Sequence, residues 1–277
     1  MNKFFSLLSL MFALLLGMAS CDTTVREAVD ERKSKDHGCA TLLPAACSLE
    51  PEAPVDERRS KDHGDPISVR LTLTPGRLVN QVFTPLIDPK VEQTNSQTIE
   101  YMLQKHIGWA PISSSKSGFD VFQNSEDTTL VYRLDIKYFD LLYKDITYQF
   151  VENGQDKIHQ HFFTADSLYT QQGKVRNNEK TNLILSYTYG DTDPWSQEMG
   201  TNGVRWIGKD NPIGFKGYFR FHKAQKFDLN IRLMHARVSK YSRRNHALSP
   251  FYAPSPGQLS EDAWDLSMRF PITVSRQ

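Results

Sequence analysis

Apolar and polar residues alternate along many segments after residue 67, and this period of two constrains the fold more than any other feature. Such alternation is typical of a β-strand with one buried face. Several strands of this kind, each apolar on one side, favour antiparallel sheets packed face to face. We therefore expect a mainly β fold, an antiparallel β-sandwich of the immunoglobulin-like or jelly-roll-like kind. The apolar faces are predicted at Val69, Leu71 and Leu73; at Leu130, Tyr132, Leu134, Ile136 and Tyr138; at Ile146, Tyr148 and Phe150; at Leu183, Leu185, Tyr187 and Tyr189; at Phe227, Leu229, Ile231 and Leu233; and at Leu266, Met268, Phe270, Ile272 and Val274.

Turn residues separate these segments. Pro75-Gly76 is expected to end the first strand, and Asn153-Gly154 is a strong signal for a tight hairpin. Pro271 falls within the last apolar run, and because proline lacks an N–H donor it predicts that this strand lies at a sheet edge.

One segment has helical rather than strand spacing. A helix is predicted there, beginning after a cap at Asn95 or Ser96 and ending at Gly108. The residues with the i, i+3, i+4, i+7 and i+8 spacing of one helix face are Ile99, Met102, Leu103, His106 and Ile107.

The N-terminus has the pattern of a secretory signal, with a charged start, an apolar run and small residues before Cys21. This pattern resembles the lipobox of bacterial lipoproteins, although Met18 stands where the family usually has leucine. The resemblance implies removal of residues 1–20, lipid on Cys21, and a membrane-anchored protein of the bacterial cell envelope, with the outer membrane favoured. The alternative is an ordinary signal peptide with an incidental cysteine. The apolar run is shorter than the roughly 20 residues of a transmembrane span.

Residues 21–66 are predicted to be a flexible tether, and residues 67–277 one folded domain. Residues 22–66 contain few large apolar residues and no aromatic residue, so they cannot bury enough surface to offset the loss of chain entropy. Residues 29–38 recur as 55–64 with nine of ten positions identical. The repeat is either a duplication in a tolerant linker or a bivalent binding motif. Its paired Asp-His steps, Asp36-His37 and Asp62-His63, predict at most weak metal binding.

Three cysteines are present, at positions 21, 39 and 47. If Cys21 carries lipid, Cys39 and Cys47 remain as a pair that an oxidising compartment can join in a disulfide. Two free thiols are the alternative. Their spacing matches no zinc motif.

Cations concentrate between residues 203 and 244, where eleven Lys and Arg residues face only two acidic ones. If the strands of this segment are adjacent, their cations form a patch that attracts an envelope protein partner or an anionic polymer. A solvated face balanced by acidic loops is the alternative. The chain's net charge of only +1 argues against nucleic acid as a partner. The predicted partner-binding residues are Arg205, Trp206, Lys216, Arg220, Arg232, Arg237, Arg243 and Arg244.

Three tryptophans lie among turn residues and suggest a surface that binds glycans. Trp195, Trp206 and Trp264 on exposed loops are able to stack against sugar rings, whereas tryptophans that plug the ends of a core are the structural alternative.

His159-Gln160-His161 places two imidazoles on one face if the segment is a strand, with Asp166 as a conceivable third metal ligand. No acidic residue at a diagnostic spacing supports this, so neither a metal nor a cofactor is expected. No nucleophile elbow, His-Glu-X-X-His helix or phosphate loop is present. A hydrolase with a dispersed active site remains an alternative, because the members of a catalytic triad need not be close in sequence.

The order of several segments resembles the gliding-motility lipoprotein H family of Bacteroidota. Val204-Arg205-Trp206-Ile207-Gly208-Lys209 precedes Gly217–Phe221 and Phe227–Met234, and Leu130–Tyr138 lies upstream. The likeness covers at most residues 119–235, and the chain after Tyr241 departs from it. It implies a β-sandwich lipoprotein without enzymatic activity in a gliding or secretion machine. The leading expectation is thus a non-catalytic accessory or adaptor subunit of an envelope assembly, with a surface glycan-binding lipoprotein as the alternative.

Overall fold

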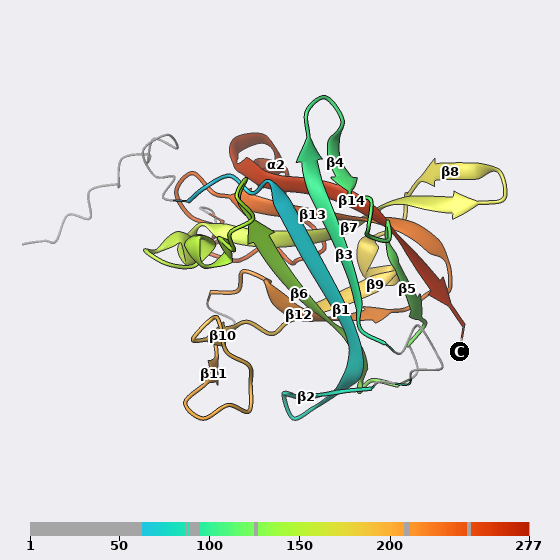
Figure 1. Cartoon of the computed structure of the whole chain (residues 1–277), viewed down its shortest axis with the longest axis horizontal. Helices are drawn as coiled ribbons and strands as arrows, with labels where there is room; N and C mark the ends of the chain where they lie inside the picture. Colours follow the sequence, from blue (N-terminus) through green and yellow to red (C-terminus); the bar gives the residue numbers. More distant parts are fainter. Residues whose placement is uncertain are drawn as a thin grey trace, which may run out of the picture. The chain divides into compact units, whose positions relative to one another are not determined.

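The computed structural model describes residues 63–86, 88, 95–124, 127–207, 211–242 and 245–276. Strands dominate this part of the chain and form two large curled sheets and one short two-stranded ribbon (Figure 1). The expectation of a mainly β, antiparallel sandwich is confirmed. Among the described residues, no helix is long and apolar enough to cross a membrane.

The first sheet has the strand order β4-β3-β1-β6-β12-β9, and β2 adds to the free part of β1. All of its pairings are antiparallel. Its strands are β1 (Ser68–Val79), β2 (Val82–Pro85), β3 (Gln97–Gln104), β4 (Gly108–Pro111), β6 (Leu130–Phe139), β9 (Leu185–Tyr189) and β12 (Lys216–Phe221).

The second sheet has the order β5-β14-β13-β7-β8. Its pairings are antiparallel except that β5 runs parallel to β14. Its strands are β5 (Phe119–Phe122), β7 (His159–Thr170), β8 (Gly173–Arg176), β13 (Lys226–His235) and β14 (Ala263–Ser275). The ribbon consists of β10 (Thr192–Asp193) and β11 (Arg205–Trp206).

The core lies between the two sheets. Phe163 of β7 packs against Phe219 of β12 with ring centroids 5.2 Å apart. Nearly all of the apolar faces predicted on β1, β6, β13 and β14 point into this core and are at most 4% exposed; Leu130, at the start of β6, is only half-buried. Burial of these aliphatic and aromatic side chains is the main favourable contribution to folding.

The predicted helix over residues 99–107 is wrong, because this segment forms β3 and the turn that follows it. Ile99 and Tyr101 are buried with a period of two, whereas Leu103 and Ile107 are 43% and 72% exposed. Pairing of β3 with β1 satisfies the backbone and outweighs the helical spacing. The α-helix that the structure does describe is α2 (Pro256–Glu261), which Ser255 and Gln258 cap reciprocally.

The segment around Phe150 also differs from expectation. It forms the 3₁₀ turn η2 (Thr147–Phe150) rather than a strand, although Phe150 is fully buried. Asn153 and Gly154 adopt positive φ values of 53° and 82°, as the turn signal predicts. This turn leads into a second 3₁₀ turn, η3 (Gln155–Lys157), and does not join two strands.

Two proline predictions need correction. Pro75-Gly76 does not end β1: Gly76 pairs with Val131 and with Pro85, and a Cβ at Gly76 would lie 2.3 Å from the Phe83 ring. Pro271 does not mark an edge strand, because β14 lies between β13 and β5. Pairing with β5 begins only at Ile272, so the proline directly precedes the part of β14 that has two neighbours.

The folded body also begins earlier than expected. The predicted tether extended to residue 66, but His63 is only 7% exposed and packs against Phe150 with ring centroids 4.3 Å apart. The composition of residues 63–66 is polar, and the burial of His63 depends on partners far away in the sequence. The rest of the predicted tether, residues 21–62, lies outside the described residues.

Candidate metal centre

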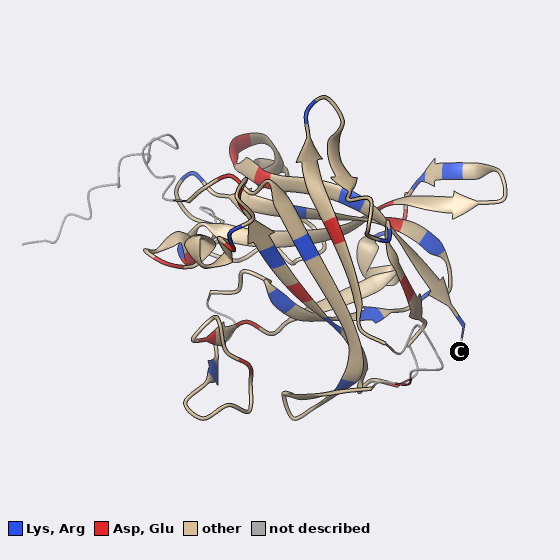
Figure 2. Ribbon diagram, in the orientation of Figure 1, with Lys and Arg blue, Asp and Glu red and all other residues tan. Residues whose placement is uncertain are grey.

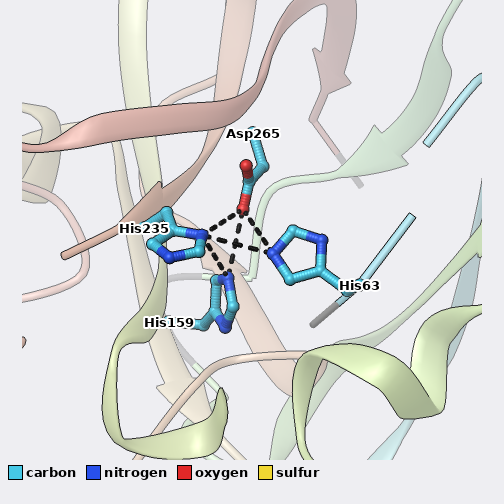
Figure 3. Close-up of side chains that lie close together, drawn as sticks. All are labelled: His63, His159, His235 and Asp265. Carbon is cyan, nitrogen blue, oxygen red and sulfur yellow. Dashed lines mark hydrogen bonds and ion pairs between the residues drawn. The ribbon is translucent and has the colours of Figure 1, made fainter. Parts of the chain in front are cut away.

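Four metal-ligating side chains meet inside one end of the sandwich: His63, His159, His235 and Asp265 (Figure 3). Their facing atoms are Nε2 of His63, Nε2 of His159, Nδ1 of His235 and Oδ2 of Asp265. All four atoms lie within 4.8 Å of one another. The side chains are almost fully buried, at 0%, 0%, 2% and 5% exposed in that order.

Strand register brings two of the histidines together. His159 begins β7 and His235 ends β13, and the two residues are directly opposite each other in the antiparallel pair. Side chains opposite each other on one face of a sheet lie about 5 Å apart at Cβ. Both imidazoles therefore face the core, with ring centroids 4.7 Å apart.

A β-bulge places the carboxylate. Leu233 pairs with Leu266 and Met234 pairs with Trp264, so that Asp265 has no residue opposite it. An extra residue of this kind bends its strand and redirects a side chain. Asp265 thereby points inward, toward His159 and His235, and its neighbours Trp264 and Leu266 lie on opposite faces of the sheet.

His63 comes from outside the sheets. It lies just before β1, at the penultimate position of the second copy of the repeat. Its ring packs against the rings of Phe150 and His159. Gly64 helps to fix this segment, because its N–H donates to Oε1 of Gln149 at 2.8 Å.

The distances between the four facing atoms are similar. His63 Nε2 lies 3.2 Å from His235 Nδ1 and 3.4 Å from Asp265 Oδ2. His159 Nε2 lies 3.2 Å from His235 Nδ1 and 3.1 Å from Asp265 Oδ2. His235 Nδ1 and Asp265 Oδ2 are 3.2 Å apart. Five of the six separations thus fall between 3.1 and 3.4 Å.

The outer nitrogens of two histidines contact backbone carbonyls. His159 Nδ1 lies 2.8 Å from the oxygen of Gln155, and His63 Nδ1 lies 3.2 Å from the oxygen of Gly64. A carbonyl oxygen only accepts, so each Nδ1 carries the proton in a neutral ring and each Nε2 has a lone pair that faces the cluster.

Burial favours the neutral form of these rings. It lowers the pKa of His63 to about 4 and also lowers the pKa of His159. Burial opposes ionisation of Asp265, but its contacts with His159 and His235 outweigh this and hold its pKa below its ordinary value. Near neutral pH, the cluster therefore combines two neutral imidazoles that present lone pairs with one carboxylate.

Such an arrangement is suited to hold a cation. Lone pairs that converge in a buried space repel one another unless a proton or metal ion lies between them. The cluster supplies four protein ligands and has little exposure, which is typical of a structural metal site rather than a catalytic one with an open position.

The histidine prediction was partly wrong. His159 and His161 do share the inner face of β7, but His161 bonds to Tyr138 Oη at 2.6 Å and to the oxygen of Ile213 at 3.1 Å instead of joining the cluster. Asp166 lies on the opposite face, where it contacts Asn230 and Arg269. His63 belongs to one of the Asp-His steps noted in the sequence, but no local pattern joined it to His235 and Asp265, because their convergence depends on strand register and a bulge.

The predicted basic residues do not form one surface. Lys216 and Arg220 lie on the outer face of β12 in the first sheet, whereas Arg232 lies on the outer face of β13 in the second. Outer faces of a sandwich point in opposite directions. Figure 2 shows Lys and Arg spread over both sheets with Asp and Glu among them.

Acidic partners also reduce the exposed positive charge of these residues. Arg205 pairs with Asp193 at 2.5 Å, and Lys216 lies 3.9 Å from Glu198. Arg232 lies 4.0 Å from Asp166, with its guanidinium over the Trp264 ring. Arg237 is exposed after the end of β13.

The three tryptophans are half-buried, and two of them lie on strands rather than loops. Trp206 is on β11 near Tyr218, and Trp264 is on β14 against Phe162. Trp195 packs against the core and lines a cavity of about 500 Å³. Carboxylates of Asp135, Glu152 and Glu198 also line this cavity.

Several predicted residues lie outside the described part of the chain. These are the lipidation residue Cys21, the possible disulfide partners Cys39 and Cys47, the first copy of the repeat, and Arg243 and Arg244.

Comparison with known proteins adds no relative. No protein-family model, no curated protein and no solved structure gives a significant match to the chain. The resemblance to the gliding-motility lipoprotein family therefore stays a prediction.

Proposed function

We propose that this protein is a lipid-anchored, non-catalytic accessory or adaptor subunit of a bacterial cell-envelope assembly of the secretion or gliding type. The lipobox-like sequence at Cys21 supports the anchor. The observation that carries the adaptor role is an exposed apolar end of the folded body, formed by Leu103, Ile107, Leu141 and Leu142.

This apolar end is unusually well exposed. Leu141 and Leu142 are 81% and 87% exposed in the loop after β6, and Ile107 is 72% exposed in the turn after β3. Isolated exposed leucines are common on soluble proteins, whereas four exposed apolar residues at the same end of one sheet favour a surface that another molecule covers.

The apolar end lies beside the start of β1, where the chain from the lipid anchor reaches the body. The N–H of Ile67 donates to the oxygen of Phe139, and the N–H of Leu103 donates to the oxygen of Ile67. The loop bearing Leu141 and Leu142 begins directly after Phe139, the last residue of β6. Proximity to the anchored segment favours a partner that is itself located at the membrane.

Cross-linking in living cells tests the adaptor role. The protein, tagged at its C-terminus, is cross-linked and purified, and captured envelope proteins are identified. We expect Leu141→Ser with Leu142→Ser to remove the capture without unfolding the body. Leu183→Ser is the matched control, because Leu183 is also exposed (54%) but belongs to the 3₁₀ turn η4 (Thr181–Leu183). Equal capture by all variants would reject the apolar end as the docking surface.

Glycan binding is the second candidate, and the cavity beside Trp195 favours it. An aromatic ring next to several carboxylates combines a stacking surface with acceptors for sugar hydroxyl groups. Titration of tryptophan fluorescence with cell-wall or host glycans tests it. A saturable change that Trp195→Ala removes and Trp264→Phe retains would support glycan binding, and the absence of any change would exclude it for the glycans tested.

A further inference from the structure

We propose that His63, His159, His235 and Asp265 bind one Zn²⁺ ion, and that this ion fastens the segment before β1 to the second sheet. The proposal concerns a site that the envelope role does not use, and it holds or fails independently of that role.

The spacing of the ligand atoms matches tetrahedral zinc. Zn–N and Zn–O bonds are about 2.0–2.2 Å long, which places neighbouring ligand atoms of a tetrahedron about 3.3–3.6 Å apart. The observed separations of 3.1–3.4 Å agree with this, and the sixth pair lies within 4.8 Å, so the four atoms are not arranged as a flat rhombus. Closing that sixth pair, between the Nε2 atoms of His63 and His159, to the tetrahedral spacing completes the site and requires a movement of up to about 1.5 Å.

Hydrogen bonds alone do not account for the cluster. The Nδ1 protons of His63 and His159 face backbone carbonyls, so neither ring has a proton left for the centre. His235 is able to place one proton on Nδ1, and that proton serves a single acceptor. At least two lone pairs then face each other without a hydrogen between them, whereas a metal ion satisfies all four atoms.

The chemical types of the four ligand atoms indicate which class of metal ion the site binds. Three imidazole nitrogens and one carboxylate oxygen at tetrahedral spacing favour Zn²⁺ over Ca²⁺ or Mg²⁺, which require six or more oxygen ligands. The carbonyl oxygens of Gln155 and Gly64 orient two of the imidazoles, as the outer contacts of zinc-bound histidines usually do.

The ligands come from both halves of the fold. His159, His235 and Asp265 belong to β7, β13 and β14 of the second sheet, and His63 belongs to the segment that leads into the first. His63 is also the one ligand outside a strand, so it is the ligand that can be replaced without breaking a strand pair.

Zinc titration of the full chain tests the site. The chain is purified, stripped with a chelator and titrated with Zn²⁺ in a calorimeter. We expect one ion per chain for the wild type, and affinity weaker by more than about 100-fold for His63→Ala, because one of four ligands is lost. The matched control is His37→Ala, which removes the equivalent histidine of the first repeat copy in the same Asp-His-Gly context. We expect this control to bind zinc as the wild type does.

Cobalt spectroscopy provides a readout that does not depend on any variant. Co²⁺ in a tetrahedral site of three nitrogens and one oxygen gives intense visible absorption without a thiolate charge-transfer band. We expect this spectrum for the wild type, and its bleaching by one equivalent of Zn²⁺.

Three results would overturn the proposal. The first is no stoichiometric zinc binding by the wild type. The second is an equal loss of affinity in His37→Ala and His63→Ala, which would place the ion in the repeat. The third is a thiolate band in the cobalt spectrum, which would assign the ion to Cys39 or Cys47.

Discussion

His159 and His161 lie two residues apart on the same face of β7, yet their surroundings differ completely. His161 is surrounded by aromatic rings, including Phe215 at 4.7 Å between centroids, and has one partner for each ring nitrogen. His159 has a backbone carbonyl on one side and three other ligating groups on the other. A buried histidine alone therefore says little about metal binding. The difference arises from what the neighbouring strands place opposite each ring, which is Leu233 for His161 and His235 for His159.

The largest expected effect is a fall in melting temperature when metal is removed from the His159 cluster, a change that does not involve His161. If zinc binds at the His159 cluster, a free zinc concentration 1,000 times the dissociation constant stabilises the fold by about 4 kcal/mol. For a domain of about 200 residues this corresponds to roughly 8–16 °C in melting temperature. We expect EDTA to lower the melting temperature of the wild type by this amount and to have little effect on His63→Ala. A similar shift in both proteins would show that the chelator acts elsewhere.

A smaller effect is expected from pH in the metal-free protein. Burial lowers the pKa of His63 from 6.5 to about 4, so the unfolded chain takes up a proton at a higher pH than the folded chain does. Between these pH values the unfolded state binds more protons, and the free energy of unfolding rises with pH. Because burial also lowers the pKa of His159 and His161, the contribution of His63 is the difference between proteins: in urea denaturation the wild type should lose about 2–3 kcal/mol more than His63→Ala as pH falls from 6.5 to 4. An equally steep dependence in His63→Ala would assign the effect to other groups.

Tyr138→Phe tests the His161 side of the comparison. The substitution removes the hydroxyl that contacts His161 Nε2 at 2.6 Å and leaves a buried nitrogen without its partner. We expect a loss of about 1–2 kcal/mol in the free energy of unfolding, measured by urea denaturation. Zinc stoichiometry should not change, and a loss of zinc binding in the folded variant would mean that the two histidine environments are coupled.

The smallest effect is expected from Asp166→Asn. Asp166 faces away from the core toward Asn230 and Arg269, so it is not a ligand despite its short distance in sequence from His159. Calorimetry should give a zinc affinity within about twofold of wild type, since distant sites act independently. A tenfold weakening would contradict the assignment of Asp265 as the fourth ligand.

The strands of the sandwich could be predicted because the alternation of apolar residues records directly which face is buried. Leu229, Ile231 and Leu233 illustrate this, since their spacing alone places them in the core. The segment at Ile99 could not be assigned in the same way. Its apolar residues fit both periods, and only pairing with β1 decides between them.

The candidate site was much less accessible to prediction. His159 was recognisable as one of two inward-facing histidines, but its partners lie 76 and 106 residues further along the chain. The division of the basic segment between two sheets was equally hidden, because adjacency in sequence suggested adjacency of β12 and β13 in one sheet. Both errors concern which strands are neighbours, a property that local patterns do not contain.

The bulge at Asp265 has a consequence for how this protein tolerates insertions and deletions. A regular ladder between β13 and β14 needs one residue fewer than the chain supplies between Trp264 and Leu266. Loss of a single codon at this place would therefore leave an uninterrupted strand whose neighbours keep their present faces. The shortened gene would encode a more regular sheet and a cluster without its carboxylate. The number of residues in the strand, and not only their identity, therefore specifies the centre.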